Sequence, residues 1–85
     1  MSYEELLRLP QWQQKRQQIL LRDGGRCRYC GANTQLQVHH RQYHRRRQTG
    51  EFVAPWSYPA HLLITLCAAC HHNGHISFHI PVFFI

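Results

Sequence analysis

Four cysteines in two C-x-x-C pairs are the residues of this 85-residue chain whose spacing most clearly predicts chemistry. The pairs are Cys27 with Cys30 and Cys67 with Cys70. Four thiolates close a tetrahedral Zn²⁺ shell, so the spacing predicts a structural zinc site. Two disulfides are the alternative, but the first residues lack the apolar core of a secretory signal. We therefore expect a cytoplasmic zinc protein rather than a disulfide-rich secreted peptide.

Three histidines accompany these pairs: His39 and His40 lie between them, and His71 follows Cys70 directly. Imidazole binds divalent metals, and with an unperturbed pKa of about 6.5 it can take a proton from water at neutral pH. His75, one helical turn after His71, could share or replace its role as a ligand. A structural metal beside a second, reactive ion suggests a nuclease rather than a plain zinc finger. In the plainer alternatives, His39 completes the zinc site and His40 is a packed core residue.

The elements that must position these residues can be predicted from periodicity and turn signals. Apolar residues at helical spacing, Pro10 at the start and Gly24-Gly25 at the end predict an N-terminal helix over about 10–23. Leu36–His39 alternates apolar and polar residues, which predicts a strand that ends in the histidine pair. We expect a second strand over Leu63–Leu66, a short helix over Cys70–His75 and a loop from Arg41 to about Ala60.

Size and charge limit what such a chain can be. It is long enough for one domain, 1–85, which buries too little apolar surface to be comfortably stable without a metal or disulfides. Ten lysines and arginines, nine of them arginine, against four acidic residues give a net charge of +6, which suits a polyanionic partner such as DNA or RNA. No run approaches the roughly 18 apolar residues of a membrane span, so we expect no membrane association.

A basic run follows the histidine pair and is the candidate nucleic-acid contact. Its guanidinium groups could grip backbone phosphates, while the alternative is a solvated charge cluster. The run consists of Arg41, His44, Arg45, Arg46 and Arg47. Arg26 and Arg28, beside the first cysteine pair, are further candidates.

In the last ten residues, 76–85, apolar and polar residues alternate, and the segment then ends in four consecutive apolar residues. We expect a strand that packs on the core or pairs with another chain, either a second copy or a partner protein. A loose terminus is the alternative.

The order of these motifs resembles the HNH endonuclease family, also called ββα-metal or His-Me finger nucleases. The resemblance runs from about Trp12 to His75. It is carried by C-x-x-C, then Leu-Gln-Val-His-His, then Pro-Trp-x-Tyr-Pro, then Leu-Ile-Thr-Leu-Cys-x-x-Cys-His. The closest subtype in pattern is that of short bacterial and phage proteins with a tryptophan-containing N-terminal helix.

The resemblance implies a small α+β, zinc-stabilised ββα-metal domain that acts as a metal-dependent DNA endonuclease or nickase. It implies that His39 and His71 hold a catalytic divalent ion, with His75 as a rival ligand, and that His40 is the general base. The implied catalytic ion is Mg²⁺ or Mn²⁺, with Zn²⁺ or Ni²⁺ as alternatives. The family's usual Asn position falls on Leu62, a departure that leaves a catalytically inactive DNA- or protein-binding zinc module as the second hypothesis.

Overall fold

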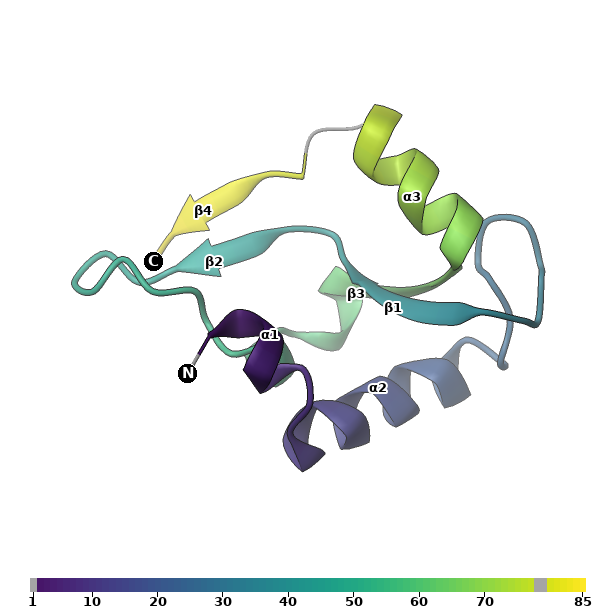
Figure 1. Ribbon diagram of the computed structural model, residues 1–85, viewed down its shortest axis with the longest axis horizontal. Helices are drawn as coiled ribbons and strands as arrows, with labels where there is room; N and C mark the ends of the chain where they lie inside the picture. Colours follow the sequence, from purple (N-terminus) through teal and green to yellow (C-terminus); the bar gives the residue numbers. More distant parts are fainter. Residues whose placement is uncertain (1, 78–79) are drawn as a thin grey trace.

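A small antiparallel sheet lies between two helices in the computed structural model, which describes the backbone of residues 2–77 and 80–85 and the side chains of 2–73 and 80–85 (Figure 1). Strands β1 and β3 form this sheet, with helix α2 on one side and helix α3 on the other. The fold is therefore α+β, as predicted. In chain order the elements are α1 (Tyr3–Leu6), α2 (Pro10–Arg22), β1 (Leu36–His40), β2 (Tyr43–Arg45), 3₁₀ turns at Pro55–Ser57 and Ala60–Leu62, β3 (Leu63–Cys67), α3 (Ala68–Ser77) and β4 (Val82–Phe84).

Helix α2 begins at Pro10 and ends at Arg22, close to the predicted 10–23. Proline suits the first helical turn, where its missing N–H would have no intrahelical partner. Trp12 and Ile19 lie two turns apart and are both buried, so the helix presents one apolar side to the sheet. They form the core together with Val38, Val53, Tyr58 and Leu63.

The register of the β1–β3 pair sends the two adjacent histidines to opposite faces. His39 lies opposite Ile64, and His40 lies opposite Leu63. Because side chains alternate along a strand, His40 shares the α2 side with Leu63, where its ring stacks on Trp12. His39 points to the other side, where its ring meets His71 of α3. The sheet therefore separates the environments of two neighbouring residues.

The segment from Arg41 to Ala60 contains structure where the sequence predicts a loop. Tyr43–Arg45 forms β2, which pairs in parallel with β4 from the C-terminal tail. A bridge also joins Arg45 to Phe52. Local periodicity could not reveal β2, because its partner strand lies almost forty residues later in the chain.

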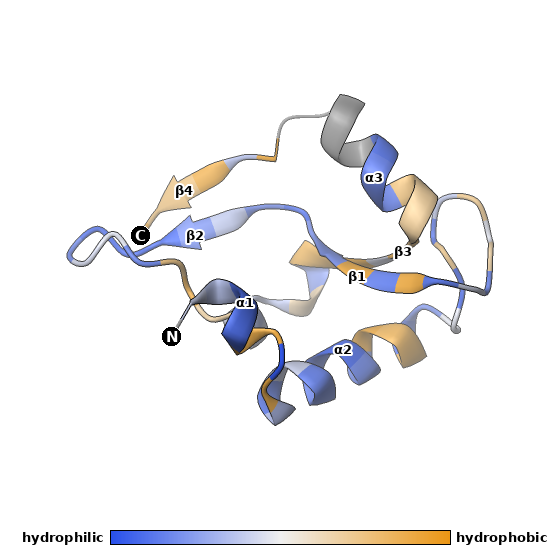
Figure 2. Cartoon of the chain, viewed as in Figure 1, coloured by the Kyte–Doolittle hydropathy of each residue, from blue (hydrophilic) through white to orange (hydrophobic). Residues whose placement is uncertain are grey.

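The predicted tail strand, 76–85, is confirmed only at Val82–Phe84, whose partner is β2 of the same chain. Residues 76 and 77 instead form the end of helix α3. Residues 78 and 79 of the predicted tail lie outside the described residues. Val82, Phe83, Phe84 and Ile85 are between 42% and 56% exposed, and β4 is a hydrophobic element at the surface in Figure 2. Pairing within the chain thus satisfies one edge of β4 but leaves its apolar side chains partly in solvent.

Asp23 binds the outer edge of β3, which is the edge that does not pair with β1. Its Oδ2 accepts a hydrogen bond from the backbone N–H of Thr65 at 2.9 Å, and Arg22 donates to both carboxylate oxygens. The carboxylate is almost fully buried. Burial alone would raise the pKa of Asp23, but the hydrogen bonds from Arg22 and Thr65 outweigh it and lower the pKa.

We expect Asp23→Asn to lower the free energy of unfolding by about 2 kcal/mol, because it removes one partner of a buried, hydrogen-bonded charge pair. Since the folded-state pKa is lowered, the stabilisation is complete above the unfolded pKa of about 3.9 and is lost as pH falls through the folded value. Urea unfolding at pH 7 and at acid pH measures both effects. The exposed Glu51→Gln is the charge-matched control, and equal stability of the two variants would contradict the role of Asp23.

Candidate functional site

The four cysteines come together as a possible metal site. Their Sγ atoms all lie within 4.8 Å of one another, and Cys30 and Cys67 are 3.6 Å apart. A tetrahedral zinc site with Zn–S bonds of about 2.3 Å has sulfur–sulfur edges of about 3.8 Å. The separations therefore fit a single ion held by Cys27, Cys30, Cys67 and Cys70.

Two different local structures deliver these sulfurs. The first pair sits on a tight turn, where the N–H of Cys30 points at Cys27 Sγ at 3.5 Å and Gly31 adopts φ +82°. That φ favours glycine, which is why glycine follows the second cysteine. The second pair spans a strand–helix junction, with Cys67 at the end of β3 and Cys70 in the first turn of α3.

The pKa values of two of these thiols, Cys27 and Cys70, favour the binding of a cation between them. Burial raises the pKa of Cys27, but hydrogen bonds from the backbone N–H groups of Cys30, Cys67 and Tyr29 outweigh it and lower the pKa to about 6. The neighbouring thiols raise the pKa of Cys70 to about 12, with Cys67 the largest contributor. Cys27 can therefore ionise unaided near neutral pH, whereas ionisation of Cys70 requires a positive ion nearby.

His39 and His71 form the second cluster. Their ring centroids are 4.7 Å apart at an interplanar angle of 71°. The Nδ1–H of His71 donates to Oε1 of Gln37, an amide oxygen that can only accept. This contact assigns the proton of a neutral His71 to Nδ1, so the basic lone pair of its ring is on Nε2. Of the three predicted ligands, His39 and His71 are thus brought together, while the side chain of His75 lies outside the described residues.

Within the side chains that the structure describes, the only group of three or more potential metal ligands is the four cysteines. Two imidazoles alone make an incomplete coordination shell, so an ion at His39 and His71 would take its other ligands from water or from a bound phosphate. This fits an open site better than a closed structural one.

His40 lies in a cage of aromatic rings and is only 4% exposed. It stacks between Trp12, at 5.2 Å between centroids, and Tyr43, at 5.4 Å, and it meets the edge of Tyr58. Its Nε2 is 3.1 Å from the carbonyl oxygen of Pro55, which can only accept, so Nε2 carries the proton. The basic lone pair of neutral His40 is therefore on Nδ1.

The surroundings of His40 keep it neutral. Burial lowers its pKa, the hydrogen bond to the carbonyl of Pro55 raises it in part, and repulsion from His71 lowers it further. The net result is a pKa below the ordinary value. A neutral imidazole is the form that can accept a proton.

The basic run after the histidine pair divides into engaged and exposed members. The Nε of Arg45 donates to the carbonyl of Gly50 at 2.7 Å, and its guanidinium lies over Phe52. His44 Nε2 accepts from the side-chain amide of Gln42 at 2.6 Å. Arg41, Arg46 and Arg47 are therefore the exposed members of this run, and the further candidates Arg26 and Arg28 are exposed as well.

Two contributors were not predicted from the sequence. Gln37 precedes His39 by two residues on the same strand, so alternation along β1 could have indicated that both side chains share a face. The carbonyl of Pro55 carries no side-chain signal. It reaches His40 only because the segment between β1 and β3 folds back over the core.

Comparisons with family models, with curated proteins and with solved structures returned no match for this chain. The arrangement of its own residues is therefore the basis for any functional conclusion. None of the helices in the described part of the chain has the length and apolar character needed to cross a membrane.

Proposed function

We propose that this domain hydrolyses phosphodiester bonds in DNA as a metal-dependent endonuclease of the HNH type, on a scaffold held by zinc at the four cysteines. The observation that carries the proposal is the order and packing of β1, β3 and α3. Two antiparallel strands followed directly by a helix bring the rings of His39 and His71 within 4.7 Å of each other, beside the four cysteines. This order of elements agrees with the ββα-metal fold that the sequence motifs resemble.

Each chemical requirement of the reaction has a candidate group. His39 and His71 would hold a divalent ion, Mg²⁺ or Mn²⁺, with His71 binding through Nε2, the nitrogen that carries its lone pair when Nδ1 donates to Gln37. When bound, such an ion supplies positive charge for the phosphate and the departing oxygen. His40 points to the opposite face of the sheet from His39 and His71, so as the proposed base, neutral and protonated on Nε2, it would take the proton of the attacking water at Nδ1 from that side.

The hydrogen bond between His40 and the carbonyl of Pro55 is relevant to Leu62, which occupies the position where the HNH family usually has Asn. A general base must be held in one tautomer and one orientation to be effective. The carbonyl of Pro55 does this for His40 through Nε2–H, and the stacked rings of Trp12 and Tyr43 restrict rotation of the imidazole. A side chain at position 62 is not needed for that purpose.

A second candidate function is a zinc-stabilised module that binds nucleic acid or a protein without cutting. The burial of His40 favours it, because a base that is 4% exposed is enclosed in the aromatic core. The two candidates differ in one measurable property, which is the release of nicked DNA.

We expect the purified protein to nick supercoiled plasmid DNA in Mg²⁺ or Mn²⁺, and we expect His71→Ala to reduce the rate at least about 100-fold, since it removes half of the proposed ion site. His72→Ala is the matched control, because it removes an exposed histidine from the adjacent position of the same helix. Absence of nicking in every metal would leave the binding module as the function. Equal rates for the two variants would remove His71 from the ion site.

A further inference from the structure

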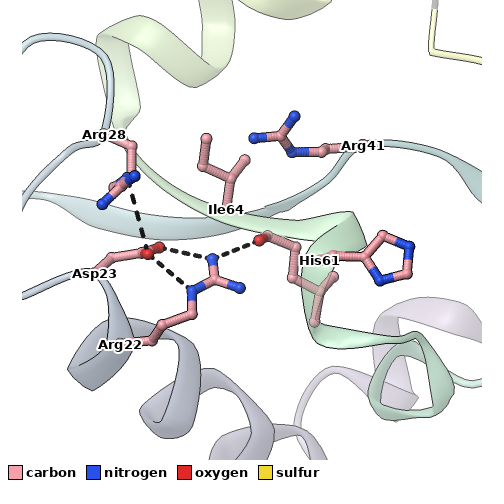
Figure 3. Close-up of a pocket in the computed structure, with 7 residues that line it drawn as sticks. Arg22, Asp23, Arg28, Arg41, His61 and Ile64 are labelled. Carbon is pink, nitrogen blue, oxygen red and sulfur yellow. Dashed lines mark hydrogen bonds and ion pairs between the residues drawn. The ribbon is translucent and has the colours of Figure 1, made fainter.

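The outer edge of β3 contains a polar cleft of about 260 Å³ that neither the zinc site nor the histidine cluster uses (Figure 3). Three arginines and a histidine line it, around an apolar floor. The lining residues are Arg22, Asp23, Arg28, Arg41, His61, Leu63 and Ile64. They come from the end of α2, the first cysteine turn, the end of β1 and the start of β3.

Charge is not balanced within this cleft. Four of the five N–H groups of Arg22 are engaged, two with the oxygens of Asp23 and two with the carbonyls of Ala60 and Leu63. Asp23 accepts hydrogen bonds from Arg22 and from the N–H of Thr65. This pair is neutral as a unit. Arg28 and Arg41 therefore give the cleft an excess of about two positive charges, before any contribution from His61.

The guanidinium groups of Arg28 and Arg41 are available to a ligand. Arg28 approaches Asp23 only at 4.0 Å, and its side chain is 57% exposed. The side chain of Arg41 is exposed and makes no hydrogen bond within the described residues. Figure 3 shows the two arginines on either side of Ile64.

The backbones that carry these two arginines are anchored to the same strand region. The N–H of Arg28 donates to the carbonyl of Thr65 at 2.9 Å, and the N–H of Arg41 donates to the carbonyl of Leu62 at 2.7 Å. Their separation is thus set by hydrogen bonds rather than by a flexible loop. Such preorganisation reduces the entropy that a bound anion would cost.

We propose that Arg28 and Arg41 form a binding site for one backbone phosphate of a nucleic-acid strand, with His61 as a third donor. Two planar guanidinium forks matched to one anion are the usual protein solution for phosphate oxygens. The choice of nucleic acid as the ligand rests on the proposed function. The site adds to that function the path that the bound strand would follow.

That path follows from the register of the sheet. Ile64, at the floor of the cleft, is the cross-strand partner of His39, so the two side chains share the face that carries α3. Arg41 follows His40 directly. A strand whose phosphate lies between Arg28 and Arg41 would continue along this face toward the rings of His39 and His71. The cleft therefore positions the strand beside the predicted reacting centre.

The test is fluorescence anisotropy of a labelled single-stranded DNA oligonucleotide with the zinc-loaded protein, without added Mg²⁺ or Mn²⁺ so that cleavage does not interfere. We expect Arg28→Gln and Arg41→Gln each to weaken binding about tenfold and to reduce the slope of log affinity against log salt by about one. Arg8→Gln removes the same charge from an exposed position outside the cleft and should change affinity less than about twofold.

Equal effects of all three substitutions would overturn the proposal, because binding would then depend on the general positive charge of the protein and not on the cleft. A wild-type protein that does not bind the oligonucleotide would also overturn it. The nuclease proposal fails separately, in the plasmid assay. If binding depends on Arg28 and Arg41 but no nicking occurs, the phosphate site stands and the nuclease proposal fails. If nicking occurs and does not depend on either arginine, the nuclease proposal stands and the phosphate site fails.

Discussion

Removal of the metal from the four cysteines is expected to unfold the protein. A domain of 85 residues has a free energy of unfolding of at most about 5–15 kcal/mol, while structural zinc in comparable sites contributes about 10–16 kcal/mol. An ion at the four sulfurs would link the turn at Cys27–Cys30 to the end of β3 and the start of α3, so its removal would free that turn from the β3–α3 junction. Circular dichroism and zinc analysis before and after addition of a strong chelator measure the effect.

Cys27→Ser should have the same outcome, because Cys27 is buried and its pKa is lowered to about 6, which favours the thiolate that binds a metal ion. Tyr29→Ser is the matched control in the same turn, since Tyr29 is 86% exposed. We expect Tyr29→Ser to retain zinc and fold. A cooperative thermal transition that persists after complete loss of metal would contradict the structural role of the site.

Substitution of His40 is expected to have the largest effect on activity. His40→Gln should lower the nicking rate by about 100- to 10,000-fold, the range that a general base contributes. Glutamine retains a donor for the carbonyl of Pro55 but has no group that takes a proton at neutral pH. Plasmid nicking at pH 7, with zinc content and melting temperature measured in parallel, separates catalysis from folding.

The position of His40 in the core requires a second control. Its ring fills space between Trp12 and Tyr43, so any smaller or reshaped side chain will also cost stability, by about 1–3 kcal/mol. Val38→Ala creates a cavity two residues earlier on the same face of β1 without removing a titratable group. We expect Val38→Ala to lower the melting temperature yet retain most of the activity. Comparable activity in His40→Gln and Val38→Ala would exclude His40 as the base.

The sequence alone was sufficient where the signal is local. The spacing of the C-x-x-C pairs predicts the cysteine cluster because each pair is brought together locally, the first on a tight turn that Gly31 completes and the second at the junction of β3 and α3. The stripe of Trp12 and Ile19 predicts helix α2 because its period is set by the helix itself. The alternation in Leu36–His40 predicts that adjacent histidines point apart, which the β1–β3 register bears out.

Only the tertiary structure decided the surroundings of those residues. Nothing near position 40 indicates that its ring would stack between Trp12 and Tyr43 or donate to the carbonyl of Pro55, since the three groups come from separate segments. Strand β2 likewise depends on a partner from the tail. The cleft between Arg28 and Arg41 exists because both residues bond to the backbone around β3. Contacts between distant segments depend on packing and register, and neither is encoded in a local pattern of residue types.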